Sequence, residues 1–214
     1  TLYSNVISYP FVHDDHVFIV NNLSLERWDD LPKIFLKPAV FSSDAPAAAN
    51  SYYRPVLEVV NKILFLFFGR MASGYHFFNV ILHILNSFLA YWFFYRFSRQ
   101  KLLALAASLL FLVHPAQTET VCAIAGISNL LAALFCFGSL YFYIRREDSS
   151  SQRRNAYLLA ALFLFLLALL TKESTVMLPF VLVFYEILSK GLKGAKKKSA
   201  KKFFPVIPFF GLLA

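Results

Sequence analysis

The chain has 214 residues, of which 58% are hydrophobic, 18% are aromatic and 25 are phenylalanine. A soluble domain is about 45–50% apolar, so this composition excludes an ordinary soluble protein and indicates an integral membrane protein. The formal net charge of +9 would suggest nucleic-acid binding in a soluble protein. In a membrane protein, the positions of the charges along the chain decide what they mean.

Residues 1–75 form a polar segment that carries seven of the twelve acidic residues. Near its start, the adjacent carboxylates Asp14 and Asp15 lie between the apolar runs 11–12 and 17–20. Most adjacent acidic pairs belong to ordinary polar turns. A carboxylate held against apolar surface, however, keeps a raised pKa and can serve as a general base. We therefore expect residues 1–75 to be a loop domain that carries a catalytic acidic pair.

The second half of this loop contains an amphipathic helix. Residues 55–68 are mostly apolar but carry Glu58, Asn61 and Lys62 at positions i, i+3 and i+4. This spacing puts the three polar side chains on one helical face, which is typical of a helix that lies in the membrane interface.

The first clear membrane span covers residues 77–95, which contain no formal charge. Its polar residues Asn79, His83 and Asn86 follow one helical face, and His76 directly precedes it. Such groups must face protein or a cavity inside a membrane. Two alternatives stay open: hydrogen bonds between helices, or a cavity lined by His76, Asn79 and His83.

Two longer apolar stretches follow, and each has a polar break. Residues 102–144 are interrupted at 114–120, and residues 156–188 at 171–174. A helix of 33 residues would be about 50 Å long, against a hydrocarbon core of about 30 Å. Each stretch is therefore expected to form a helical hairpin. The predicted transmembrane region, 76–214, has helices at about 77–95, 102–113, 121–144, 156–170 and 175–188, and the start of another at 203–214.

The basic residues support this topology. The connections 96–101, 145–155 and 189–202 carry 14 basic residues, whereas the two hairpin tips carry only Lys172. Positive charges collect on the cytoplasmic side, so the tips and residues 1–75 are expected on the extracytoplasmic side. One membrane face would then hold Asp14, Asp15, His114, Glu119, Lys172 and Glu173.

The charged tips have a simpler interpretation as solvated turns, since proline commonly follows a span. A glutamate at membrane depth, however, is costly without a partner.

The lysine run 190–202 fits a cytoplasmic loop that meets anionic lipid better than it fits nucleic-acid binding. The histidines have no spacing that indicates a metal site.

These motifs together resemble those of the transmembrane and tetratricopeptide-repeat family of O-mannosyltransferases and their bacterial relatives. Those proteins belong to the GT-C glycosyltransferases, with the protein O-mannosyltransferases and the lipid A aminoarabinose transferases. The resemblance covers nearly the whole chain. The motifs, in order, are Phe11-Val12-His13-Asp14-Asp15, Asn21-Asn22, Tyr53-Arg54-Pro55, His76 with Asn79-Val80 and Leu82-His83, His114-Pro115 with Thr118-Glu119 and Val121, and Lys172-Glu173.

The resemblance implies an all-α fold: a polytopic transmembrane helical bundle with a large first extracytoplasmic loop that carries short amphipathic helices. It also implies inverting transfer of a sugar, with mannose as the candidate, from a polyprenyl- or dolichyl-phosphate carrier to a hydroxyl of a protein or glycan acceptor. The active site would face the periplasm of a bacterium or the lumen of the endoplasmic reticulum. The expected partners are membrane lipid, the lipid-linked donor and the acceptor, without nucleic acid.

The resemblance also suggests roles for the site residues. Asp14 would deprotonate the acceptor hydroxyl, and Asp15 would orient the acceptor or a neighbouring group. The substrate-binding candidates are Arg54, His114, Glu119, Lys172 and Glu173, with Arg54 and Lys172 as the cations beside the donor phosphate. No cofactor other than the lipid-linked donor is expected, and a divalent metal is compatible with this chemistry but not indicated.

The chain departs from the family pattern in three places. Family members usually carry an arginine after the glycine that follows the Thr-Glu motif, whereas Gly126 is followed by Ile127, Ser128 and Asn129. If that arginine holds the donor phosphate, either another residue replaces it here or the donor differs. The 214 residues contain neither the tetratricopeptide repeats nor the membrane helix expected before the loop. The first residue is Thr1 and not Met, and residues 209–214 stop inside an apolar run, so we expect a fragment truncated at both ends.

Two other functions compete with the transferase. A transporter or flippase of lipid-linked substrates would also use intramembrane polar residues, but transporters often show internal repeats, which this sequence lacks. A non-catalytic membrane scaffold is the third alternative.

The topology can be tested by cysteine labelling. Cysteines placed at Ser43 and Thr118 should react with an impermeant reagent added to intact cells, because both positions are expected outside. A cysteine at Ser150 should react only after the membrane is opened. Labelling of the Ser150 variant in intact cells would contradict the predicted membrane topology.

Overall fold

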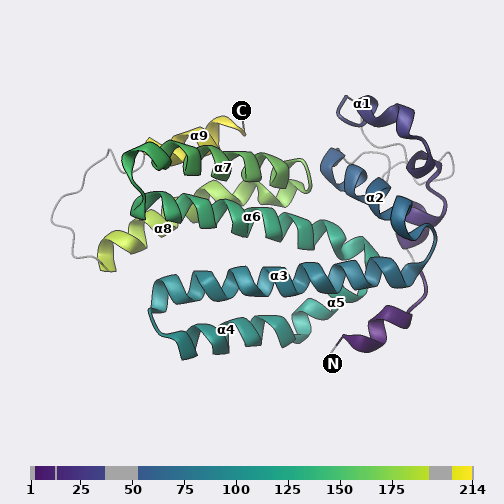
Figure 1. Cartoon of the computed structure of the whole chain (residues 1–214), viewed down its shortest axis with the longest axis horizontal. Helices are drawn as coiled ribbons and strands as arrows, with labels where there is room; N and C mark the ends of the chain where they lie inside the picture. Colours follow the sequence, from purple (N-terminus) through teal and green to yellow (C-terminus); the bar gives the residue numbers. More distant parts are fainter. Residues whose placement is uncertain (1–2, 13, 37–52, 193–203, 214) are drawn as a thin grey trace. The chain divides into compact units, whose positions relative to one another are not determined.

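The computed structural model describes residues 3–12, 14–36, 53–192 and 204–213 (Figure 1). His13, Ser43 and most of the lysine run 190–202 lie outside the described residues. Within these ranges the secondary structure is helical and contains no strand, which confirms the all-α class. Three segments are long and apolar enough to cross a membrane, and a bent helix pair is a fourth candidate.

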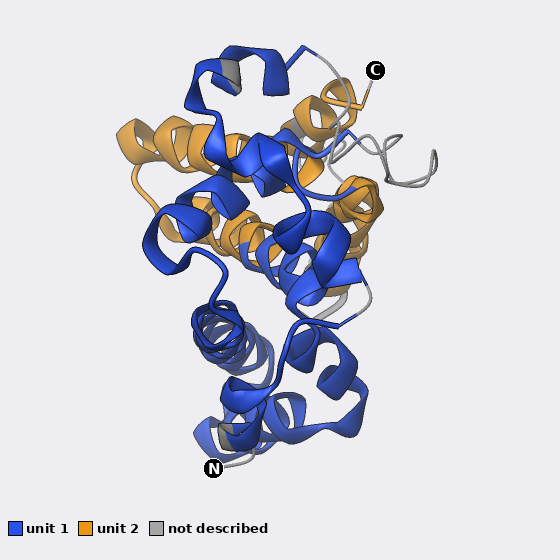
Figure 2. Cartoon of the chain, turned by 90° about the vertical axis from the view of Figure 1, so that its right-hand side faces the viewer, with its two compact units in different colours: residues 1–134, 170–172 blue, residues 135–169, 173–214 orange. Residues whose placement is uncertain are grey.

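The described residues divide into two compact units, which are coloured separately in Figure 2. Unit 1 comprises residues 1–134 and 170–172, and unit 2 comprises residues 135–169 and 173–214. The polar loop, the first helical hairpin and the tip of the second hairpin thus belong to one unit.

Unit 1 begins with short helical turns. They are η1 (Ser4–Ser8), the π-helical turn η2 (His16–Val20), η3 (Leu23–Glu26), η4 (Trp28–Asp30) and α1 (Leu31–Ile34). These turns bury Val6, Ile19, Leu25 and Ile34. A short helix cannot satisfy its own terminal N–H groups, and Asn22 supplies an acceptor by taking a hydrogen bond from the Ser24 N–H at 3.0 Å.

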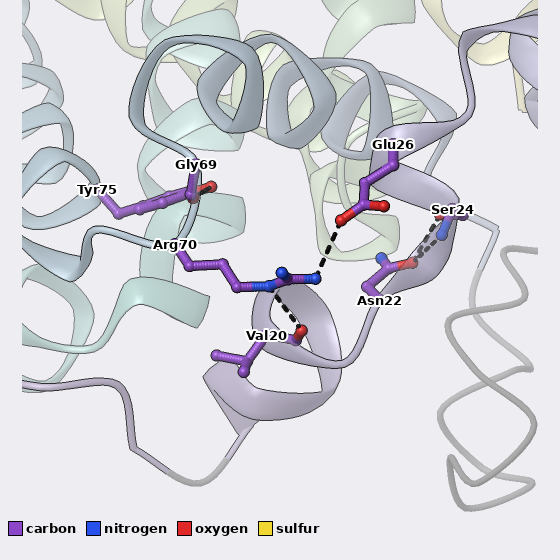
Figure 3. A network of polar contacts seen from close by, with 7 residues as sticks. All are labelled: Val20, Asn22, Ser24, Glu26, Gly69, Arg70 and Tyr75. Carbon is purple, nitrogen blue, oxygen red and sulfur yellow. Dashed lines mark hydrogen bonds and ion pairs between the residues drawn. The ribbon is translucent and has the colours of Figure 1, made fainter.

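A polar network joins these turns to the next helices (Figure 3). The guanidinium of Arg70 donates from Nε to the Val20 carbonyl at 3.3 Å and pairs through Nη2 with Glu26 at 3.0 Å. The Tyr75 hydroxyl donates to the carbonyl of Gly69, a residue in the left-handed region with φ +52°. Glycine adopts that conformation without strain, so the chain can turn here from α2 into α3.

Helix α2 (Pro55–Phe68) has the bounds predicted from the sequence. Its polar face, however, points into the protein: Lys62 is 1% exposed and donates to the carbonyls of Ser24 and Arg27. The opposite face exposes Leu66 and Phe67, the latter by 73%. Because an apolar face on the outside favours contact with lipid, α2 suits the membrane interface, with its polar side covered by residues 3–36.

Helix α3 (Ala72–Ser98) packs along α4 (Lys101–Val113) as a hairpin, which Figure 1 shows side by side. Helix α4 ends before His114-Pro115, where Pro115 starts η6 (Pro115–Gln117) and the chain bends by 47° into α5 (Thr118–Cys122). The sequence thus predicted this break correctly. Proline has no N–H and disfavours a helical residue before it, so α4 cannot continue through this point.

A second break lies where a single helix was expected over 121–144. The structure has α5, then η7 (Ile124–Gly126), and then α6 (Ile127–Arg145). A Cβ on Gly126 would meet the Thr120 carbonyl oxygen at 2.0 Å, so only glycine permits this close approach of the two backbones.

The polar stripe of α3 makes hydrogen bonds between helical segments. Asn79 donates to the Ala123 carbonyl at 2.8 Å, and Asn86 donates to the Leu130 carbonyl at 2.9 Å. The His83 Nε2 lies 3.0 Å from the Leu112 carbonyl oxygen. The stripe therefore serves helix packing, which is one of the two alternatives left open by the sequence.

Unit 2 contains the second half of α6, η8 (Arg146–Asp148), α7 (Ser151–Leu169), η9 (Glu173–Met177), α8 (Leu178–Leu192), η11 (Phe204–Val206) and α9 (Ile207–Gly211). The polar break at 171–174 separates α7 from η9, as expected. The Ser139 hydroxyl donates to the Ala161 carbonyl at 2.8 Å and joins α6 to α7.

A buried charge cluster joins α6 and η8 to α8. Glu186 accepts a hydrogen bond from the Tyr143 hydroxyl at 2.7 Å and pairs with Arg146 at 3.5 Å. The Arg146 guanidinium also lies 4.3 Å from the centroid of the Tyr143 ring. All three side chains are buried. Each charge therefore depends on the other for its compensation.

This dependence predicts a non-additive pair of variants. Glu186→Leu should lower the free energy of unfolding by about 3 kcal/mol, because Arg146 then stays buried without its carboxylate. Arg146→Met combined with Glu186→Leu should recover most of that loss, since two apolar side chains replace the pair. Reversible unfolding in detergent micelles measures both. A double variant as unstable as Glu186→Leu alone would mean that the two charges are not coupled.

Candidate active site

Asp15 ties the acidic loop to the rest of unit 1. Its side chain is 1% exposed. One carboxylate oxygen, Oδ2, accepts the Val12 N–H at 3.0 Å and closes the turn of its own loop. The other, Oδ1, accepts the Ala125 N–H in η7, also at 3.0 Å. Because both oxygens are used, Asp15 connects two segments that lie 110 positions apart in the sequence.

Asp14 differs from its neighbour because its side chain is exposed. The buried Asp15 carboxylate fixes the backbone of this turn, and the fixed backbone presents Asp14 to solvent. An exposed carboxylate remains accessible to a substrate hydroxyl. The two adjacent acids thus have different surroundings, a distinction that the sequence alone did not provide.

A small pocket lies beside the segment that Asp15 holds. Its volume is about 30 Å³. The residues that line it come from η2, the start of α2, η7 and the start of α6: Phe18, Ile19, Arg54, Leu57, Asn61, Ile124, Ala125, Ile127 and Ser128. Arg54 is therefore next to the first turn of α6.

Lys172 also lies at the start of α6. Its ammonium group donates to Oδ1 of Asn129, the third residue of that helix. The Leu170 carbonyl accepts the Val56 N–H at 3.1 Å, which holds the tip of the second hairpin against the first turn of α2. Two cations and the N-terminus of a 19-residue helix are thus gathered in one place. The helix dipole adds positive potential there, so the arrangement favours an anion.

The other predicted substrate-binding residues do not line this pocket. His114 is exposed, and its Nδ1 accepts the Ala116 N–H at 3.1 Å, so the imidazole caps η6. Glu119 is exposed in the first turn of α5. Glu173 begins η9 and belongs to unit 2. The contacts described for His114 and Glu119 do not bring them to the pocket.

His76 is buried in the first turns of α3, where its ring packs edge-on against Tyr9 at 6.4 Å between centroids. With Asn79 and His83, it lies within the packing between α3 and its neighbours. Among the described residues, no three His, Cys, Asp or Glu side chains form a group that would hold a metal ion.

The polar face of α2 carries groups that sequence reasoning assigned only to an interface. Burial raises the pKa of the Glu58 carboxyl, and the nearby Lys62 ammonium and Ser24 hydroxyl oppose that rise. Asn61 lies one turn away from Leu57 and lines the pocket. The i, i+3, i+4 spacing identified the face, but it did not reveal that residues 3–36 cover it.

Comparison with known proteins supports the assignment of these motifs. Residues 51–212 match the model of the family described as dolichyl-phosphate-mannose-protein mannosyltransferase. The chain is 30% identical over 208 residues to the mouse (Mus musculus) protein O-mannosyl-transferase TMTC1, an alignment that covers 91% of this chain and 22% of the relative. No solved structure matches.

Two further relatives are also named as protein O-mannosyl-transferases. The Caenorhabditis elegans protein O-mannosyl-transferase F38B6.6 is 29% identical over 153 residues, which cover 68% of this chain and 22% of the relative. Human (Homo sapiens) TMTC4 is 29% identical over 199 residues, which cover 85% and 27%. The chain spans about a quarter or less of the length of these relatives. The family match extends over most of the chain and confirms the resemblance that the motifs indicate, so the chain belongs to the dolichyl-phosphate-mannose-protein mannosyltransferase family.

Proposed function

We propose that the protein is an integral-membrane glycosyltransferase that moves mannose from a dolichyl- or polyprenyl-phosphate carrier to a hydroxyl group of a protein acceptor. The family membership supports this activity over the transporter and scaffold alternatives. The observation that carries the proposal is the gathering of Arg54 and Lys172 at the N-terminus of α6, in the same unit as the acidic loop.

The domain arrangement follows from the same proposal. Residues 1–75 form the extracytoplasmic loop, with α2 in the membrane interface, and residues 76–214 form the membrane region. The contact of residues 170–172 with α2 supports one common face for the loop and the second hairpin tip. The positive-inside rule then makes that face extracytoplasmic.

The donor phosphate binds at the start of α6 in this proposal. Arg54 replaces the arginine that family members carry after Gly126, because it reaches the same helix start from α2. Lys172 supplies the second positive charge. Cations and a helix dipole that are fixed before the reaction stabilise the charge that develops on the leaving phosphate, and they need no rearrangement to do so.

Asp14 acts as the general base. The acceptor oxygen attacks the anomeric carbon of the sugar from the side opposite the phosphate, and its proton passes to the Asp14 carboxylate. The bond between the anomeric carbon and the phosphate oxygen breaks, and the lipid phosphate leaves with the electron pair. Attack opposite the leaving group inverts the anomeric configuration. Positioning the two reactants contributes alongside base catalysis.

Replacement of the base and of a cation should have different kinetic effects. In the full-length protein, Asp14→Asn should slow the chemical step by about 10²-fold or more, with donor affinity nearly unchanged. Lys172→Met should weaken donor binding and turnover together, because a cation beside a phosphate acts in both the ground state and the transition state. Single-turnover transfer from labelled polyprenyl-phosphate mannose measures both effects.

Exposed residues of the same charge serve as matched controls. Asp29→Asn removes an exposed acid from the same loop, and Lys101→Met removes an exposed cation at the start of α4. Both controls should transfer at the wild-type rate. Full activity of Asp14→Asn would refute the role of Asp14 as the base. Normal donor affinity of Lys172→Met would refute the assignment of Lys172 to the donor phosphate.

Asp15 is a positioning residue, and its effect should appear in loop order. In Asp15→Asn, an amide N–H₂ replaces one acceptor oxygen and faces an N–H donor at Val12 or Ala125. Hydrogen exchange of the amides in residues 12–20 should therefore become faster, and transfer should fall. Asp14→Asn should leave that exchange unchanged, since its side chain is exposed. Equal protection in both variants would mean that Asp15 does not hold the loop.

A further inference from the structure

The pocket beside Arg54 contains a buried polar group without a partner. Asn61 is 4% exposed, and its Oδ1 makes no hydrogen bond within the described residues. Burying an amide oxygen without a hydrogen bond is unfavourable, so such an atom requires a physical explanation. Asn61 lines the pocket, which makes the pocket the place where a partner can reach this oxygen.

Polar groups of Ser128 and Ala125, which also line the pocket, already have hydrogen-bond partners within the protein. The Ser128 hydroxyl donates to the Ala125 carbonyl at 3.2 Å, and the Ala125 N–H donates to Asp15. Most of the wall is apolar, from Phe18, Ile19, Leu57, Ile124 and Ile127. Apart from Arg54, which belongs to the proposed phosphate site, the pocket combines an apolar wall with one neutral amide. This combination suits a ligand group with a carbon arm and a single hydroxyl.

The size of the pocket limits what can enter. A volume of about 30 Å³ exceeds the roughly 10–15 Å³ that one water needs on this measure. It holds a hydroxymethyl group but not a sugar ring. Ring hydroxyls are bonded directly to the ring and cannot enter such a space while the ring remains outside, whereas the exocyclic carbon of a hexose projects its hydroxyl one bond further.

The position of the pocket also suits a hydroxymethyl group of the sugar. Arg54 and the first turn of α6 line the pocket and also form the proposed phosphate site. The transferred sugar is bonded to that phosphate, so its exocyclic group lies within reach of the pocket.

We propose that Asn61 recognises the hydroxymethyl group of the transferred hexose, with its amide paired to the terminal hydroxyl and the exocyclic carbon against Leu57 and Ile124. This inference rests on the proposed transferase function and adds a determinant of sugar specificity to it. A hydroxyl both donates and accepts a hydrogen bond, so it satisfies either end of the amide. A sugar without this hydroxyl leaves Asn61 unpaired, which disfavours that sugar.

The test compares two donors in the full-length protein: polyprenyl-phosphate mannose and its 6-deoxy analogue. The wild type should transfer mannose about tenfold faster at limiting donor, the effect expected for one neutral hydrogen bond. Asn61→Leu keeps the branching and the number of heavy atoms of the side chain but has no amide. It should slow transfer of mannose to the rate of the 6-deoxy sugar and so bring the ratio of the two donors close to one, because neither sugar then finds a polar partner.

The ratio is taken within each preparation, so a reduced folded fraction cancels. Asn61→Ala is the second variant, and it should shift the ratio in the same direction if the leucine does not fit. Asn86→Leu is the matched control: it removes a buried asparagine whose Nδ2 bonds to the Leu130 carbonyl. It should lower stability without changing the donor ratio.

The outcomes separate the two proposals. A wild type that transfers mannose and the 6-deoxy sugar equally well overturns the assignment of Asn61 and leaves the transferase intact. Donor ratios that stay unchanged in both Asn61 variants also overturn the assignment of Asn61 and leave the transferase intact. A wild type that transfers from neither donor overturns the proposed function itself.

Discussion

The candidate site depends on the two hydrogen bonds that the Asp15 carboxylate accepts from Val12 and Ala125. An ionised carboxylate has acceptors only, and here each oxygen receives one backbone N–H. Hydrogen bonds to a charged group are stronger than neutral ones, which offsets the cost of burial. This single side chain fixes the turn that presents Asp14 and also holds η7, whose residues line the pocket. Loss of Asp15 would therefore affect both sides of the proposed reaction.

Around this anchor, several polar side chains of unit 1 are buried, and large apolar side chains on the same helices are exposed. Lys62 is covered by the turns of residues 3–36, whereas Phe67 on the same helix is exposed. The asparagines of α3 likewise donate to backbone carbonyls of other segments. A membrane imposes this order, because a polar group that faces hydrocarbon has no water to bond with.

The bounds of a helix could be predicted from the sequence wherever a proline or a glycine limits the helix. Pro55 and Gly69 limit α2, and His114-Pro115 ends α4, as proline and glycine at those positions predict. The break between Cys122 and Ile127 was not predicted, because the approach of Gly126 to Thr120 is a tertiary contact between two apolar segments. Hydropathy does not distinguish such a break from a continuous helix.

The candidate site was predictable only in part. The resemblance and the charge pattern selected Arg54 and Lys172, and both lie at the start of α6. The resemblance gave Asp14 and Asp15 different roles, but it did not predict that Asp14 is exposed and Asp15 is buried, because burial depends on tertiary contacts such as the one with Ala125. Asn61 was assigned to a solvated helical face. Its burial depends on residues 3–36, which lack a periodic pattern that would place them over α2.

The shortness of α4 has a consequence for the surrounding lipid. Its 13 residues span about 20 Å at 1.5 Å per residue, whereas the hydrocarbon core of a bilayer is about 30 Å thick. The exposed leucines of α4 cannot cover that thickness, so the bilayer must become thinner beside this helix or the turn at His114 must lie beneath the headgroups. Each ångström of mismatch costs a fraction of a kcal/mol. A short helix on the lipid-facing side thus favours thin membranes and depresses the lipid surface at the edge of the protein, where a carrier phosphate would have a shorter distance to travel out of the headgroup layer.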